Sequence, residues 1–245
     1  MRLPYSYESH RENQKYRDYI QPLNQNVYEI LAVRAASLGV DLSQSSILDY
    51  GCNQGHLLTT ARGRILPTNY FGVDINPRAL ELAKAKHPEA NWLHYDCFNN
   101  TFNPGGVQDL PIPLERQFDV VVAHGVFTHY FMEDIVREIE ILKSFAREGG
   151  LVLFSIWEDV DFYGYLGFLD RELGMNLGLG KPTKYENGLI LVNRQEVLID
   201  VEKMPGRVFD WVEAFYRQDY ILRKIPGSVR THGPAAKHPV YGIRL

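Results

Sequence analysis

Three aspartates, each predicted to end a strand, are the side chains of this sequence best placed to do chemistry: Asp49, Asp74 and Asp96. As isolated residues they would more often cap a helix or face solvent, but acids at successive strand ends are unusual in a purely structural sheet. Ligands bind at that edge of an open parallel sheet. Asp74 also lies 19 residues after Gly55, a spacing at which a carboxylate accepts hydrogen bonds from ribose hydroxyls. The pattern therefore predicts a nucleoside site.

The loop between the first two acids indicates the kind of nucleoside. Residues 47–58, ILDYGCNQGHLL, run from an apolar strand through a glycine turn into a helix. A loop for a dinucleotide pyrophosphate needs a third glycine for close packing of the helix on the strand, but His56 occupies that position. Asp49 would also bring negative charge near bound phosphates. The loop therefore favours a phosphate-free cationic nucleoside, whose ammonium and sulfonium would be attracted to Asp49.

The elements that must position these residues alternate along the chain. Short apolar strands are predicted at residues 46–50, 70–75, 92–95, 118–123 and 151–157. Helices are predicted from Asn26 to Leu38, from Asn76-Pro77 to His87-Pro88, and from Glu133 to Arg147. Continuously apolar strands that alternate with helices predict a parallel sheet buried on both faces. Right-handed crossovers then make it an open, doubly wound α/β fold.

This alternation breaks after residue 157. One domain is predicted over residues 1–245, with an N-terminal helical cap at 1–40 and an insertion at 158–190. Apolar residues recur at helical spacing from Phe162 to Leu173, which predicts an amphipathic helix inside the insertion. A further helix is expected from Asn193 to about Lys203, and extended segments are expected at 208–216 and 239–245.

Composition excludes several classes of protein. The chain of 245 residues is 45% hydrophobic and 23% charged, as globular proteins are. Its net charge of -4 argues against a polyanionic partner, although the stretch from Lys203 onward has eight Lys or Arg against three Asp or Glu. No apolar run approaches the ~18 residues of a membrane span. The first residues lack the apolar core of a signal peptide. We expect a cytoplasmic protein, monomeric or homodimeric, whose two cysteines form no metal site.

Four segments together resemble the sequential motifs of class I S-adenosylmethionine-dependent methyltransferases: ILDYGCNQGHLL, YFGVDINPRALELAKAK, LHYDCFN and FDVVVAHGVFTHY. They follow the family's order at typical spacing and cover residues 45–157. The resemblance implies a Rossmann-like methyltransferase fold with a mostly parallel, seven-stranded sheet. It also implies S-adenosyl-L-methionine as the cofactor and S-adenosyl-L-homocysteine as its product.

The resemblance further implies which residues bind the cofactor. They follow the four strand ends: Asp49, Gly51, Cys52, Asn53, Gly55, Asp74, Ile75, Asp96, Cys97, Ala123 and His124. The glycine loop would shape the methionine end, Asp74 would hold the ribose hydroxyls, and Ile75 would pack against the adenine. Asp96 would accept from the adenine amino group, beside the backbone of Cys97. Asn53 replaces the usual middle glycine of the loop, so we predict a left-handed or bridging backbone at that residue.

Methyl transfer from a sulfonium is an in-line displacement, in which positioning the acceptor supplies ~7–11 kcal/mol. A general base helps where the acceptor carries a proton. Candidate catalytic residues follow the fourth and fifth strands: His124, His129, Glu158 and Asp159. Each also has a purely structural interpretation: the histidines could cap or pack a helix, and the acids, with Asp161, could form a solvated loop. The acids could alternatively bind a cationic acceptor.

The acceptor is expected to be a small molecule. Aromatic residues of the insertion and the N-terminal segment could form a lid over it, although some could simply pack the insertion: Tyr5, Tyr7, Phe162, Tyr163 and Tyr165. Base-amino methyltransferases carry Asn/Asp-Pro-Pro-Tyr/Phe where this chain has Ala123-His-Gly-Val126. The paired-glutamate loop of protein arginine methyltransferases is also missing from the sequence. Two alternatives stay open: an RNA methyltransferase of the same fold, based on the basic C-terminal stretch, and a cofactor-binding protein that does not methylate.

Overall fold

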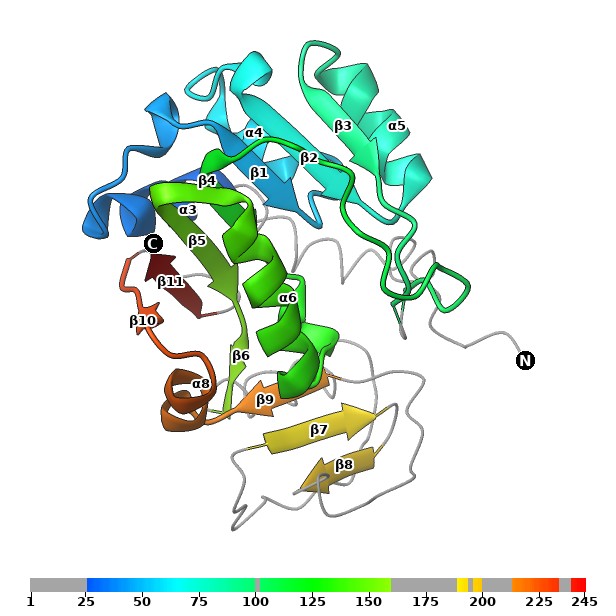
Figure 1. The fold of residues 1–245 in the computed structure, drawn as a ribbon, viewed down its shortest axis with the longest axis vertical. Coiled ribbons are helices and arrows are strands. Elements are labelled where there is room, and N and C mark those ends of the chain that lie inside the picture. The colour runs from blue at the N-terminus through cyan, green and yellow to red at the C-terminus, as the bar shows by residue number, and fades with distance from the viewer. Residues whose placement is uncertain (1–25, 100–101, 160–188, 194–195, 200–212, 234–238) are drawn as a thin grey trace.

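A seven-stranded sheet with the order β10-β11-β5-β4-β1-β2-β3 is the centre of the molecule (Figure 1). The computed structural model describes residues 26–99, 102–159, 189–193, 196–199, 213–233 and 239–245. The strands are β1 Ile47–Tyr50, β2 Tyr70–Asp74, β3 Asn91–His94, β4 Phe118–Ala123, β5 Ala146–Ser155, β10 Val229–Arg230 and β11 Val240–Arg244. β1 to β5 pair in parallel, whereas β11 is antiparallel to both β5 and β10. The predicted doubly wound, mostly parallel seven-stranded sheet is confirmed.

The central strands are apolar because helices cover both faces of the sheet. All four residues of β1 are buried, and Val120, Val121 and Val122 of β4 have no exposed surface. One face packs against α6 (Met132–Ser144), and the other packs against α3 (Val27–Ser37) and α4 (His56–Ala61). Each fully buried valine contributes about 1.5–3 kcal/mol. This burial holds the central strands in place, and with them the residues at their carboxyl ends.

The helix between β2 and β3 begins and ends as its sequence predicts. α5 (Pro77–Lys86) has proline at its first position, and the Asn76 side chain accepts a hydrogen bond from the Ala79 N–H at 3.1 Å. Lys84 and Lys86 lie in the last turn, where positive charge complements the helix dipole. Asn76 thus begins α5 two residues after Asp74, which places that acid directly before a helix.

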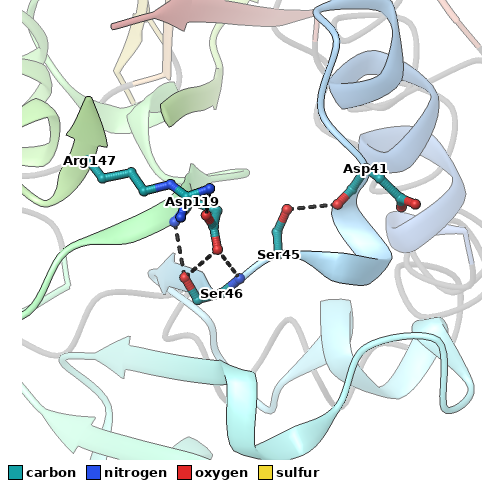
Figure 2. A network of polar contacts seen from close by, with 5 residues as sticks. All are labelled: Asp41, Ser45, Ser46, Asp119 and Arg147. Carbon is teal, nitrogen blue, oxygen red and sulfur yellow. Dashed lines mark hydrogen bonds and ion pairs between the residues drawn. The ribbon is translucent and has the colours of Figure 1, made fainter. Parts of the chain in front are cut away.

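A polar network ties the strands together at the edge opposite the predicted site (Figure 2). Ser46 donates to Asp119 Oδ2 from both its backbone N–H and its hydroxyl, each at 2.7 Å, and Arg147 forms an ion pair with Asp119. Nearby, the Ser45 hydroxyl donates to the Asp41 carbonyl at 2.7 Å. The starts of β1, β4 and β5 are therefore joined through one carboxylate.

Asp119→Asn is expected to lower the free energy of unfolding by about 1–3 kcal/mol, because it weakens these charge-assisted bonds. Burial acts to raise the pKa of Asp119, but the Ser46 hydrogen bonds and the Arg147 charge outweigh it and hold the pKa below its usual value. The carboxylate's contribution is therefore present at neutral pH and is lost as the pH falls through that lowered pKa. Urea unfolding of both proteins across acidic and neutral pH measures the effect.

The control for this prediction is Asp134→Asn, which removes the exposed ion pair between Asp134 and Arg137 on α6. It is expected to cost less than about 1 kcal/mol. Equal losses for Asp119→Asn and Asp134→Asn would contradict the structural role of Asp119.

A second sheet, which the sequence did not predict, follows the end of β5. It has the order β6-β9-β7-β8, with strands β6 Trp157–Glu158, β9 Glu213–Tyr216, β7 Leu189–Asn193 and β8 Glu196–Ile199 (Figure 1). The helix expected from Asn193 onward is wrong, because Asn193 pairs with Glu196 at one end of the antiparallel β7–β8 ladder. The three residues after Glu196 are Val, Leu and Ile, which favour a strand. α8 (Gln218–Lys224) connects β9 to β10.

The predictions for the N-terminal cap and the insertion are not tested by the described residues. Residues 1–25 of the expected cap and residues 160–188 of the expected insertion lie outside the described residues, and so do the five aromatic residues of the expected lid. Among the residues that are described, no helix combines the length and hydropathy needed to cross a membrane.

Candidate cofactor-binding site

The loop between β1 and α4 has three residues with left-handed backbones. Gly51 has φ 74°, Asn53 has φ 51° and Gly55 has φ 71°. The left-handed backbone predicted at Asn53 is confirmed. The N–H groups of Gly51 and Cys52 both donate to the Val73 carbonyl, at 2.8 and 3.1 Å. The loop is thereby fastened to the end of β2.

Close packing explains why two of these positions need glycine. A Cβ at Gly51 would lie 2.5 Å from Cγ2 of Val126, which follows β4. A Cβ at Gly55 would lie 2.6 Å from Cη2 of Trp92 on β3. Both distances are too short for any real carbon contact. The loop therefore packs closely against Val126 and Trp92, which leave no room for a side chain at residues 51 and 55.

Asp74 is held in one orientation by the backbone. Its Oδ2 accepts the Asn53 N–H at 2.7 Å, and its Oδ1 accepts the Asn76 N–H at 2.8 Å. Burial raises the pKa of Asp74 against the opposing effect of these hydrogen bonds. A carboxylate has about four acceptor sites, so Asp74 keeps capacity beyond its backbone bonds. The group can therefore also accept from a hydroxyl, such as those of a ribose.

Asp49 differs from an ordinary ionised acid. It is buried on β1, and it accepts a hydrogen bond from the Tyr70 hydroxyl. Burial raises its pKa to about 7; the Tyr70 hydrogen bond opposes this rise, and the nearby charge of Asp74 adds to it. The neighbouring Cys52 thiol is also buried, which raises its pKa well above the usual value. A ligand cation next to Asp49 would favour the ionised carboxylate.

The chain after β3 forms a short loop around Asp96. Asp96 is exposed, and its Oδ1 accepts a hydrogen bond from the Asn103 amide at 3.0 Å. The Cys97 N–H donates to the Tyr95 carbonyl at 2.8 Å. The described residues between β3 and β4 contain no helix. Asp96 therefore sits on a hydrogen-bonded loop and not at a helix start.

The turn after β4 contacts β5 on one side and the loop after β3 on the other. Ala123 is buried, His124 is half-buried, and the Gly125 N–H donates to Ser155 Oγ of β5 at 2.7 Å. The short helix η3 (Phe127–His129) follows, and the His129 ring meets Phe102 edge-on, with 4.8 Å between ring centroids. His124 and His129 thus both lie on the segment between β4 and α6.

Tyr130, which directly follows η3, forms two hydrogen bonds that the sequence did not predict. Its hydroxyl accepts from the Asn99 amide at 2.9 Å, and its carbonyl accepts from the Tyr216 hydroxyl at 2.9 Å. No motif or spacing points to either bond, because Asn99 and Tyr216 belong to different segments far apart in the sequence. The turn after β4 is therefore held by the loop after β3 on one side and by the second sheet on the other.

The expected acidic cluster after β5 is not arranged as the sequence suggested. Glu158 is buried on β6, where it accepts from the Arg230 guanidinium and, at 2.6 Å, from the Tyr241 hydroxyl. Asp159 is half-buried, and Asp161 lies outside the described residues. Glu158 thus joins the second sheet to β10 and β11, which is a structural task. Within the described part of the chain, no group of three His, Cys, Asp or Glu side chains could hold a metal ion.

The residues expected to bind a cofactor lie in or after the last residues of four neighbouring parallel strands, in the spatial order β4-β1-β2-β3. A protein-family model described as a methyltransferase domain matches residues 48–152, which contain all of them. Residues 48–152 thus form a methyltransferase domain of the class I, S-adenosylmethionine-dependent kind. The cofactor of this methyltransferase is S-adenosylmethionine.

Individual relatives of the methyltransferase are distant. A malonyl-[acyl-carrier protein] O-methyltransferase from Acetivibrio thermocellus is 22% identical over 201 residues, which are 78% of this chain and 65% of that protein. The chain thus spans slightly less than two thirds of this curated relative.

Solved structures share the fold. An S-adenosylmethionine-dependent methyltransferase from Clostridium acetobutylicum has a TM-score of 0.56 at 14% identity, with 97% of this chain and 98% of that one covered. A magnesium protoporphyrin IX methyltransferase from Synechocystis, with bound S-adenosylhomocysteine, has a TM-score of 0.53 at 16% identity, with 94% and 86% covered. At these identities the likeness is one of fold alone.

Proposed function

We propose that this methyltransferase moves the methyl group of S-adenosylmethionine to a small-molecule acceptor. The observation that carries the proposal is the fixed carboxylate of Asp74, bonded to the loop in which Gly51 and Gly55 have no room for a side chain. The malonyl-[acyl-carrier protein] and magnesium protoporphyrin IX methyltransferases named above support a small-molecule type of acceptor. Such an acceptor also agrees with the mildly acidic net charge of -4.

The residues of the site fit this cofactor in charge and hydrogen bonding. Asp74 would accept both ribose hydroxyls through its remaining lone pairs, and Asp49 would lie near the methionine end, where a cation favours its ionised form. Ile75 would pack against the adenine, and Asp96 would accept from the adenine amino group beside Cys97. The remaining members of the site would surround the methionine: Gly51, Cys52, Asn53, Gly55, Ala123 and His124.

The chemistry asks the chain mainly to position the acceptor. When bound, the cofactor supplies a methyl group activated by its sulfonium. The acceptor atom forms a bond to that carbon as the carbon–sulfur bond breaks, and a proton released by the acceptor passes to a base or to water. His124 and His129 are the proposed bases, because both follow β4, the strand beside β1. Glu158 already accepts two hydrogen bonds, which makes it a weak candidate for a base.

The C-terminal basic stretch does not favour an RNA acceptor. Arg217 and Arg223 both pair with Asp219, and Arg230 pairs with Glu158. Three of the eight basic residues from Lys203 onward thus lie in ion pairs, and the two carboxylates offset two of their three positive charges. RNA binding depends on unneutralised positive charge that can release counterions from the phosphates. A small-molecule acceptor remains the better proposal.

Asp74→Ala is expected to weaken S-adenosylhomocysteine binding by about 100-fold, because two hydrogen bonds to a charged group are lost. Isothermal calorimetry on the wild type and the variant measures this. Asp74→Asn, which keeps one carbonyl oxygen, is expected to lie between them, and the exposed Asp134→Ala is the control. Failure of the wild type to bind would overturn the cofactor site. Binding without methyl release to any metabolite in a mass-spectrometric panel would favour a protein that does not methylate.

A further inference from the structure

The loop after β3 closes through hydrogen bonds of its own backbone. The N–H of Asn99 donates to the Asn103 carbonyl at 3.1 Å, and the N–H of Asn103 donates to the Asn99 carbonyl at 2.9 Å. Val107 donates to the Asp96 carbonyl at 2.8 Å and accepts from the Phe98 N–H at 2.9 Å. The backbone alone therefore brings residue 103 back to the start of the loop, beside Asp96.

The Asn103 side chain uses this proximity. Its amide nitrogen donates to the Cys97 carbonyl at 2.8 Å and to Asp96 Oδ1 at 3.0 Å. An amide has two N–H donors, so both are used. The Cys97 carbonyl fixes the orientation of the amide, and the amide in turn restrains the carboxylate. Without that restraint, the exposed Asp96 side chain would be free to change rotamer.

Gly106 shows how tightly the amide is enclosed. A Cβ at Gly106 would lie 2.4 Å from both the Asn103 amide nitrogen and the Cys97 carbonyl oxygen. The Gly106 N–H also donates to the Asn103 carbonyl at 3.0 Å. A side chain at residue 106 would therefore displace the Asn103 amide from the two oxygens that it contacts.

We propose that Asn103 is a positioning residue for base recognition: its amide holds Asp96 so that the second carboxylate oxygen accepts a hydrogen bond from the 6-amino group of adenine. This inference rests on the proposed function of the site. A carboxylate accepts from an amino group and repels a carbonyl oxygen in the same place. The loop after β3 then selects adenine over hypoxanthine, and Asn103 sets the strength of that selection without contacting the base.

The test compares two ligands that differ at this one position, S-adenosylhomocysteine and S-inosylhomocysteine, by calorimetry. The wild type is expected to prefer the adenosine compound by about tenfold or more, the effect of one hydrogen bond to a charged group. Asn103→Ala is expected to weaken the adenosine compound about five- to tenfold while leaving the inosine compound nearly unchanged. Asn103→Asp, which sets a second carboxylate against Asp96, is expected to weaken the adenosine compound further.

Asn99→Ala is the matched control. Its side chain accepts from the Phe102 N–H and donates to Tyr130, but it has no bond to Asp96. A general disturbance of the loop should therefore weaken both ligands by the same factor. Equal weakening of both ligands by Asn103→Ala would overturn the inference, and so would equal binding of both by the wild type. Failure of the wild type to bind either ligand would instead overturn the proposed function itself.

Discussion

Gly55→Ala is expected to lower the free energy of unfolding by about 2–5 kcal/mol and to weaken cofactor binding. Gly55 has φ 71°, and a left-handed backbone costs an L-residue about 1–2 kcal/mol. The new methyl group would also press on Trp92, and such overpacking costs about 1–3 kcal/mol. Trp92 cannot easily yield, because its indole N–H donates to the His87 carbonyl at 3.1 Å and its ring packs against Tyr70. Urea unfolding and calorimetry measure the two effects.

Two further variants separate the backbone cost from the contact. Gly63→Ala has φ 84° with nothing within 4 Å of the added carbon, so it is expected to show the backbone cost alone. In a Trp92→Leu background, which lacks the ring edge, Gly55→Ala should cost less stability than it does in the wild type. If Gly55→Ala and Gly63→Ala destabilise equally, Trp92 does not determine the need for glycine at residue 55.

The free energy of unfolding of the wild type is expected to fall relative to that of Asp49→Asn as the pH rises from about 4 to about 7. In the unfolded chain Asp49 releases its proton near its ordinary pKa of 3.8. In the folded protein its pKa is about 7, so it keeps the proton over that pH range. The folded state thus binds more protons, so the group's contribution decreases by about 1.4 kcal/mol per pH unit, and by about 4 kcal/mol in total. Asparagine cannot ionise, and its carbonyl can still accept from Tyr70.

Thermal or urea unfolding of both proteins over this pH range gives the measurement. Asp119→Asn provides a contrast of opposite sign, because the lowered pKa of Asp119 makes its contribution disappear toward acid. S-adenosylhomocysteine binding to the wild type is also expected to tighten as the pH rises toward about 7, since the ligand ammonium favours ionised Asp49. Parallel pH profiles for the wild type and Asp49→Asn would contradict the buried, protonated state of Asp49.

Local sequence signals were sufficient for the strands, the helix α5 and the loop that form the candidate site. Val120 to Val122 predicted a strand buried on both faces, Asn76-Pro77 predicted the start of α5, and Asn53 predicted a left-handed backbone. In each case the signal is a property of a few adjacent residues. The order and spacing of four such segments then identified the family.

The second sheet and the contacts around it depend on residues distant in the sequence. Asn193 and Glu196 were interpreted as a helix start because their polarity was weighed above the strand preference of Val197 and Ile199. The pairing of Glu158 with Arg230, 72 residues later, has no local pattern. Asn103 likewise reaches Asp96 through the closure of an irregular loop, which no spacing rule predicts.

The two hydrogen bonds of Tyr130 couple the second sheet to the loop after β3. Because Tyr130 accepts bonds from both Asn99 and Tyr216, the second sheet cannot shift without breaking one bond or moving the loop after β3 as well. A ligand that orders the loop after β3 and a ligand that orders the second sheet would therefore have linked binding free energies. Such linkage is reciprocal, so an acceptor whose affinity rises when the cofactor is present must raise the affinity for the cofactor by the same factor.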